Sequence, residues 1–153
     1  MMFLDVINED KMKEFGQYLG SFLIGGEIIE LIGDVGAGKT TLAKGIAIGL
    51  EVSEYVQSPS FTISRVYDGR DDLKLAHYDF YRLNDAGVMA DELSETMADK
   101  KIVTLIEWAD VASGVLPVDR LSIMISAIDE NSRKVEIKAG GEISSKLLGK
   151  LQR

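Results

Sequence analysis

A glycine-rich segment from Gly33 to Thr40 constrains the fold of this chain more than any other stretch of its sequence. The segment reads GDVGAGKT and matches the pattern G-x-x-x-x-G-K-[ST], whose glycines let backbone N–H groups converge on phosphate. A short, branched, apolar run (EIIELIG) leads into the segment, and a run of helical character (KTTLAKGIAIGL) follows it. We therefore predict a strand, a loop and a helix in this order, with the positive end of the helix dipole directed at an anion.

The residue types in this loop predict which parts of a nucleotide each would contact. Lys39 would reach the outer phosphates, and the hydroxyl group of Thr40 would bind Mg²⁺. The alternative is a glycine-rich turn that only caps an ordinary βα unit. The predicted nucleotide-binding residues of the loop are Asp34, Val35, Gly36, Ala37, Gly38, Lys39, Thr40 and Thr41.

Composition limits the classes of protein to which the chain can belong. Its 153 residues, 46% of them hydrophobic, suffice for a buried core, and we expect a single domain over residues 1–153. We see no leader-like segment and no apolar run long enough to span a membrane, so we expect a cytoplasmic protein without a membrane partner. The absence of cysteine and the single histidine exclude thiolate metal sites and an imidazole cluster for zinc. The net charge of −8 argues against unaided binding to nucleic acid.

Hydrophobic periodicity predicts further elements around the phosphate loop. An amphipathic helix is expected over residues 9–24, before Gly25 and Gly26. The runs FTISRVY and LKLAHYD flank the turn DGRDD and predict an antiparallel pair of strands. Residues 84–100 are expected to be helical in part, with Asn84 or Asp85 as candidate caps.

The last third of the chain adds a near-continuous apolar strand over residues 102–107, two alternating strands over 120–129 and 133–139, and a short helix from residue 142. Together these elements predict an α/β fold of three layers. Its mixed sheet would have parallel core strands around Ile28 and Ile102, extended by antiparallel hairpins.

Two carboxylates end predicted strands at the sheet edge where a nucleotide would bind. Glu107 ends the run IVTLIE, where a carboxylate has little structural reason to lie unless it faces a metal ion or a water molecule. Asp79 ends LKLAHYD, on the same strand face as His77. We predict Glu107 and Asp79 as catalytic residues and, together with Thr40, as the metal site; a solvated carboxylate at a strand end is the alternative for each.

Three neighbouring side chains have less specific interpretations. His77 is expected to hold its neighbours in place rather than to act as a base. Trp108, the single tryptophan, is either a partly buried aromatic residue at a strand end or a member of the site. Arg82 could stabilise phosphate charge.

Four motifs, GDVGAGKTT, SPSFT, HYDFYRL and LIEW, occur in this order and resemble the bacterial TsaE family, formerly YjeE. Members of that family are small P-loop ATPases needed to make threonylcarbamoyladenosine in tRNA, and the resemblance covers roughly residues 8–140. Two departures are visible: Ser60 stands where threonine is more usual, and residues 88–101 lack a glycine-containing pattern. The second departure concerns the local helix geometry and part of the partner surface.

The resemblance implies a P-loop ATPase that uses ATP and Mg²⁺ and acts with TsaD and TsaB, meeting tRNA only indirectly through their complex. Lys39 and Thr40 would bind phosphate and Mg²⁺, and Asp79 and Glu107 would support the metal ion and the hydrolytic water. Trp108 would belong to the functional set, SPSFT would be a switch-like segment, and Arg133 would approach the nucleotide base.

Other functions of the phosphate loop remain open. A small-molecule kinase is disfavoured because no arginine-rich lid is recognisable, and a GTPase because the sequence lacks N-K-x-D and D-x-x-G. A docking module gated by nucleotide, with incidental hydrolysis, is the alternative of a different class. For an ATPase we expect slow hydrolysis by the chain alone, since no residue is clearly an arginine finger.

Overall fold

A seven-stranded mixed sheet runs through the computed structural model, which describes residues 1–57, 59, 63–85, 87 and 89–152. The strand order is β1-β7-β6-β2-β5-β4-β3. The four central strands β6, β2, β5 and β4 run parallel, and β7, β1 and β3 extend the sheet by antiparallel pairing. The strands are β1 (Met2–Val6), β2 (Ile28–Ile32), β3 (Ser64–Asp68), β4 (Lys74–Asp79), β5 (Ile102–Glu107), β6 (Leu121–Ala127) and β7 (Arg133–Ala139).

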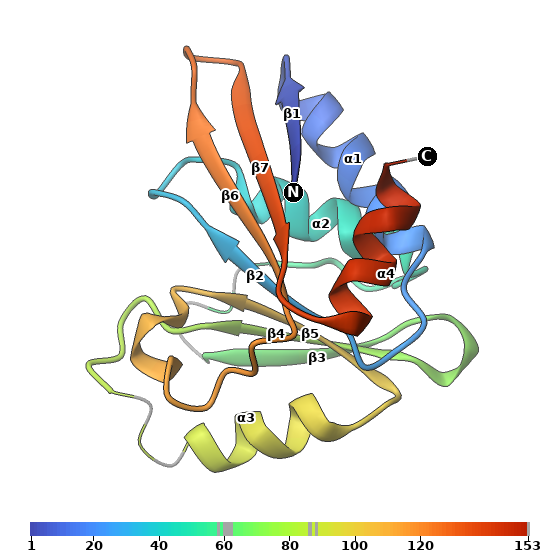
Figure 1. The fold of residues 1–153 in the computed structure, drawn as a ribbon, viewed down its shortest axis with the longest axis vertical. Coiled ribbons are helices and arrows are strands. Elements are labelled where there is room, and N and C mark those ends of the chain that lie inside the picture. Colours follow the sequence, from blue (N-terminus) through green and yellow to red (C-terminus); the bar gives the residue numbers. More distant parts are fainter. Residues whose placement is uncertain (58, 60–62, 86, 88, 153) are drawn as a thin grey trace.

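Helices cover both faces of this sheet (Figure 1). Residues of α1, α2 and α4 share one buried core with one sheet face, and Leu42, Leu75 and Leu105 are among its fully buried members. On the opposite face, Leu93 of α3 and Ala109 of η2 pack in a second, smaller core with Tyr78. The helices are α1 (Glu9–Ser21), α2 (Lys39–Gly49), α3 (Met89–Ala98) and α4 (Glu142–Leu151), with short 3₁₀ helices η1 (Arg70–Asp72) and η2 (Ala109–Ala112).

Glycine residues let α1 and α2 pack with their backbones in contact. A Cβ atom added to Gly45 of α2 would lie 2.4 Å from the Lys13 carbonyl oxygen and 2.9 Å from Gly16 Cα of α1. One turn further along, a Cβ atom on Gly49 would lie 2.9 Å from Gly20 Cα. Because a real Cβ atom does not fit at such distances, these positions must lack a side chain. This close packing fixes α2, whose first turn belongs to the phosphate loop.

The side chain of Arg70, in the turn between β3 and β4, ties the carboxyl ends of both helices together. Its Nη1 donates to the carbonyl oxygen of Gly49 at 2.7 Å, and its Nη2 donates to that of Leu23 at 2.6 Å, just after α1. A third acceptor is the carbonyl oxygen of Gly20 at 3.3 Å. Carbonyl groups at a helix end lack intrahelical partners, so one guanidinium group satisfies acceptors from two helices.

Over the described residues, the elements predicted from residue 9 onward are confirmed, with two corrections. β1, an edge strand that pairs with β7, was not predicted from the sequence. The candidate caps Asn84 and Asp85 are wrong, because α3 begins at Met89 and neither residue adjoins its first turn. Among the described residues, no helix has the length and apolar character that crossing a membrane requires.

We expect Gly45→Ala to lower the free energy of unfolding by about 1–3 kcal/mol, because the new methyl group overlaps the backbone of α1. Gly149→Ala in α4 is the matched control, since an added Cβ would meet no described heavy atom within 4 Å apart from its chain neighbours and the backbone of its own helix. The control should raise the stability by about 0.5–1 kcal/mol, since alanine favours a helix more than glycine does. Urea unfolding followed by circular dichroism measures both; equal effects would contradict the close helix contact.

Candidate functional site

The phosphate loop connects the end of β2 to the first turn of α2. Two of its glycines have positive φ angles, 83° at Gly36 and 114° at Gly38, which side-chain-bearing residues rarely adopt. Gly38 is the N-cap of α2, and its carbonyl oxygen accepts the first helical hydrogen bond from Leu42 N at 3.0 Å. The helix N-terminus, with its unpaired N–H groups and positive dipole end, therefore opens directly onto the loop.

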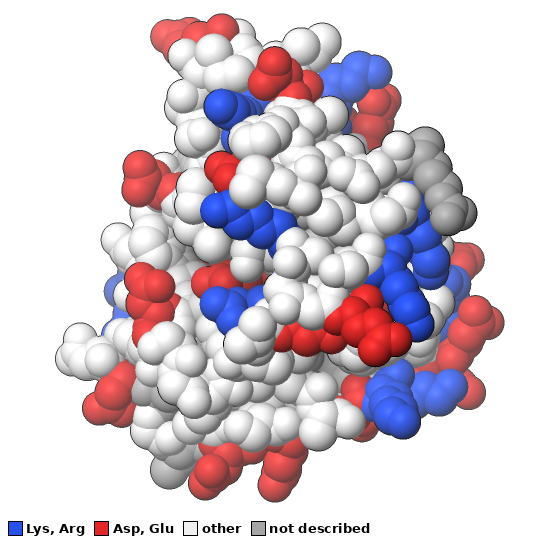
Figure 2. All heavy atoms as spheres, in the orientation of Figure 1, with Lys and Arg blue, Asp and Glu red and all other residues white. Residues whose placement is uncertain are grey.

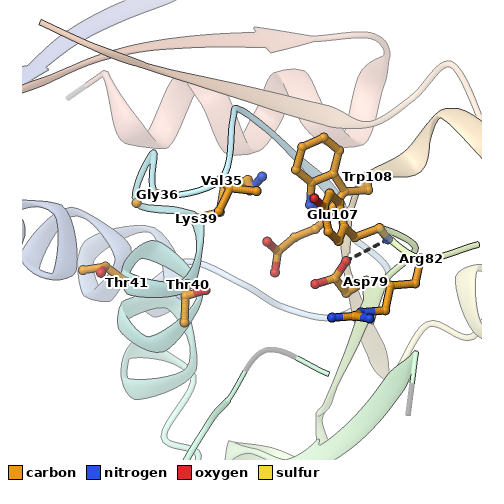
Figure 3. A pocket seen from close by; sticks show the side chains of 11 residues that line it. Val35, Gly36, Lys39, Thr40, Thr41, Asp79, Arg82, Glu107 and Trp108 are labelled. Atoms are coloured by element: carbon orange, nitrogen blue, oxygen red, sulfur yellow. Dashed lines mark hydrogen bonds between the residues drawn. The ribbon is translucent and has the colours of Figure 1, made fainter. Parts of the chain in front are cut away.

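A pocket of about 380 Å³ lies beside this loop, at the carboxyl ends of β4 and β5 (Figure 3). It brings together the predicted lysine, both predicted carboxylates and most of the predicted loop residues. The lining residues are Val35, Gly36, Gly38, Lys39, Thr40, Thr41, Asp79, Tyr81, Arg82, Glu107 and Trp108.

Asp79 and Glu107 lie directly opposite each other, as the last residues of two adjacent parallel strands. Both are largely buried, with exposed fractions of 7% and 2%. By strand alternation they lie on the same sheet face as Leu105, the face that α2 covers. Asp79 Oδ1 accepts a hydrogen bond from Tyr81 N at 3.0 Å, which fixes the carboxylate at the start of the following turn (Figure 3).

His77 lies behind this pair, fully buried on β4, two residues before Asp79. Its Nε2 is 2.6 Å from Glu107 Oε2, and its Nδ1 has no hydrogen-bond partner among the described residues. Since an ionised carboxylate can only accept, Nε2 carries the hydrogen and donates it to Glu107. One oxygen of the Glu107 carboxylate is thereby held, as expected for a histidine that positions its neighbour.

The Lys39 ammonium group lies between the loop backbone and the indole ring of Trp108. Its Nζ donates to the carbonyl oxygen of Gly33 and lies 3.9 Å from the centroid of the Trp108 ring. Burial lowers the pKa of Lys39, and the charges of Glu107 and Asp79 oppose that effect.

Trp108 takes an unusual backbone conformation to reach this position. Its φ and ψ angles of 56° and 51° are left-handed, a region that costs about 1–3 kcal/mol for a bulky residue. Its ring packs against Tyr81 with the centroids 4.8 Å apart. Backbone strain of this kind persists where the surroundings enforce it, and here it brings the indole over Lys39. Tyr81 is a pocket residue that the sequence analysis missed, although it stands inside the motif HYDFYRL.

The donors of this pocket suit a magnesium ion that arrives together with phosphate. Among the described residues, no group of three or more His, Cys, Asp and Glu side chains is arranged to hold a metal ion. Mg²⁺ is typically bound by one or two carboxylates together with phosphate oxygens and water. The carboxylates of Asp79 and Glu107 and the hydroxyl group of Thr40 line one pocket and form such a set.

Several predicted site residues lie outside this pocket. Asp34 lines an adjacent hollow, and Ala37 and Arg133 line another on the other side of the loop. Thr41 borders two of these spaces, and its Oγ1 donates to Glu9 Oε1 of α1 at 3.2 Å. The predicted switch-like segment SPSFT falls outside the described residues except for its proline, Pro59, which is buried.

Comparisons with known proteins agree on one family. The family model described as "Threonylcarbamoyl adenosine biosynthesis protein TsaE" matches residues 6–135. The tRNA threonylcarbamoyladenosine biosynthesis protein TsaE of Bacillus subtilis (strain 168) is 36% identical over 152 residues, which are 96% of this chain and 91% of that protein. The protein of the same name from Treponema pallidum (strain Nichols) is 32% identical over 80% of this chain and 90% of its own length.

A solved structure shows that the fold is shared as well. The crystal structure of Bacillus subtilis YdiB superimposes with a TM-score of 0.82 at 34% sequence identity, and the match covers 99% of this chain and 94% of that one. The predicted three-layer α/β fold, with a mixed sheet, is thus confirmed both by the element arrangement and by a known structure.

We expect His77→Leu to lower the free energy of unfolding by about 3 kcal/mol, since it leaves the buried Glu107 carboxylate without its hydrogen-bond donor. The double variant His77→Leu/Glu107→Leu should lose less than the sum of the two single variants, because no carboxylate remains unpaired. Urea unfolding of the wild type, His77→Leu, Glu107→Leu and the double variant completes this double-mutant cycle. Additive losses would show that the two side chains do not interact in solution.

Proposed function

This chain belongs to the TsaE family, whose role is in threonylcarbamoyladenosine biosynthesis on tRNA, and on that premise we propose that it is an ATPase of this machinery. It would bind ATP with Mg²⁺ and hydrolyse it to drive or reset a transferase complex of TsaD and TsaB. The observation that best supports the proposal is a single pocket in which a phosphate loop faces two buried carboxylates at the ends of adjacent strands.

Phosphate binding would rest on the loop residues Asp34 to Thr41. Backbone N–H groups at the start of α2 would donate to phosphate oxygens, and the helix dipole would favour their negative charge. When ATP binds, the Lys39 ammonium would leave its contacts with the Gly33 carbonyl and the Trp108 ring and would bind the outer phosphates instead. No large movement of the chain is needed, because Lys39 already lines the pocket.

Glu107 is the residue we propose to orient and deprotonate the attacking water. Its carboxylate lines the pocket, and His77 holds one of its oxygens, which leaves the other to accept from water. Asp79 and Thr40 would hold Mg²⁺, with Glu107 nearby, and the ion would neutralise charge on the phosphates as the bond to the leaving group breaks.

Partners enter this proposal for two reasons. Arg82 lines the pocket, yet its side chain is exposed, so stabilisation of the transition state would be completed by another protein. On the face shown in Figure 2, Lys and Arg are interspersed with Asp and Glu rather than gathered in a basic stripe. An acidic chain with this distribution would meet tRNA through TsaD and TsaB, and we propose that it does so in the cytoplasm.

A second candidate function is a docking module whose binding to partners is gated by ATP. The mouth of the pocket favours it, because Val35 and Tyr81 are exposed there by 73% and 54%. Exposed apolar side chains beside a nucleotide pocket suit a surface that a partner covers. In this alternative hydrolysis would be incidental to the modification.

We expect Glu107→Gln to bind MgATP as the wild type does and to hydrolyse it at least about 100-fold more slowly, since glutamine cannot accept a proton from water. Hydrolysis is measured for the chain alone and with TsaD, TsaB and tRNA, alongside threonylcarbamoyladenosine formation. Partner-stimulated turnover that the variant loses, together with modification, supports the ATPase. Full modification by the variant would favour the docking module instead.

Lys39→Ala and Asp79→Ala should separate phosphate binding from turnover. Loss of the Lys39 ammonium should weaken ATP binding by about 10- to 100-fold. Asp79→Ala should leave the affinity for ATP near that of the wild type and lower the Mg²⁺-dependent rate. Isothermal calorimetry gives the affinities and phosphate release gives the rates. An equal loss of ATP affinity in both variants would contradict this division of roles.

A further inference from the structure

Arg133, the first residue of β7, reaches the phosphate loop from the side opposite the candidate site. It lines a hollow of about 250 Å³ between the loop, the start of α1 and the turn that joins β6 to β7. Its Nε donates to the carbonyl oxygen of Ala37 at 3.0 Å, and its Nη2 to that of Gly36 at 3.4 Å. One guanidinium group therefore binds two consecutive carbonyl groups of the loop.

The remaining nitrogen of the guanidinium group is bound to the hairpin turn. Nη1 donates to the carbonyl oxygens of Asp129 at 2.8 Å and Ser132 at 2.9 Å. Asp129 shapes this turn, because its Oδ1 accepts from Asn131 N at 2.9 Å and from Ser132 N at 2.8 Å. These hydrogen bonds lower the pKa of Asp129. Arg133 thus bridges a structured turn and the phosphate loop.

The direction of the loop carbonyls decides the direction of its N–H groups. In a trans peptide the C=O of one residue and the N–H of the next point in opposite directions, and the described chain contains no cis peptide. With the Ala37 carbonyl directed at Arg133, the N–H of Gly38 is directed away from it. Gly36 and Gly38 both have positive φ angles, and glycine permits many other orientations of these peptide planes.

We propose that Arg133 is a positioning residue that holds the Gly36 and Ala37 carbonyls and, through the Ala37–Gly38 peptide, keeps the Gly38 N–H directed away from itself and available to phosphate. The Ala37 N–H is held within the loop, where it donates to the Asp34 carbonyl oxygen at 3.0 Å. The inference rests on the proposed function and deepens it. It differs from a contact with the nucleotide base, because each guanidinium nitrogen donates to a backbone carbonyl of the loop or of the hairpin turn, so these bonds hold the chain itself rather than a ligand. The arginine acts on the phosphates through the backbone.

Inorganic tripolyphosphate separates the two roles, since it carries the phosphates of ATP without the base. Calorimetry with Mg²⁺ compares MgATP and Mg-tripolyphosphate for the wild type, Arg133→Ala, Arg133→Lys and the control Lys134→Ala, whose ammonium lies 5.3 Å from the Phe3 ring rather than beside the loop. We expect Arg133→Ala to weaken both ligands by the same factor, about tenfold or more, which corresponds to one or two lost hydrogen bonds to a charged donor. Lys134→Ala should bind both as the wild type does.

Arg133→Lys keeps the positive charge but lacks the planar fork that joins the loop carbonyls to the hairpin turn, so it should also weaken both ligands. Thermal unfolding shows whether Arg133→Ala is still folded. If it is not, the binding measurements on Arg133→Lys decide the outcome. Loss of ATP binding with unchanged tripolyphosphate binding would overturn the inference in favour of a base contact. Unchanged binding of both ligands would overturn it in favour of a purely structural role. A wild type that binds neither ligand would overturn the proposed function itself.

Discussion

Parallel pairing of β5 with β2 on one side and β4 on the other places the candidate chemistry on one edge of the sheet. Leu31 lies opposite Glu107, and Glu107 lies opposite Asp79, so these three neighbouring strands end within one residue of the same level. The carboxyl ends of parallel strands share an edge, and the phosphate loop leaves from the same place. A slip of one residue in either pairing would turn a carboxylate toward the opposite face. The strand register is therefore the constraint on which the pocket depends.

Local chemistry made much of this architecture predictable from the sequence. The glycines and the lysine of the loop interact with groups a few residues away, and apolar runs bounded by Glu107 and Asp79 mark strand ends without reference to the rest of the chain. Edge strand β1 escaped prediction because its burial depends on pairing with β7, far away in the sequence. The caps of α3 were misplaced for a related reason, since polar residues in a loop resemble caps wherever the helix begins.

The contacts that assemble the site could not be derived from sequence spacing. His77 and Glu107 are 30 positions apart, and their hydrogen bond exists only because β4 and β5 are neighbours. Arg133 is 96 positions from Ala37 in the sequence, yet it donates a hydrogen bond to the Ala37 carbonyl oxygen. The glycines of α1 and α2 carried no signal of their own, because glycine inside a helix is only unfavourable until a partner helix requires it. These contacts depend on the order of the strands in the sheet and on which helices are neighbours, and the sequence did not predict the strand order.

The position of the Lys39 ammonium group, between a carbonyl oxygen and an indole ring, affects which anions the pocket can select. The Lys39 amine contacts a carbonyl group and an aromatic face before any anion arrives, so it is not a bare charge that would attract anions indiscriminately. Binding becomes an exchange of one set of partners for another, and only a ligand with several negative oxygens in reach offers more than the amine gives up. We therefore expect chloride, carboxylates and single phosphates to compete poorly in such an exchange. The indole ring over Lys39 thus favours ligands of high charge density over those of low charge density.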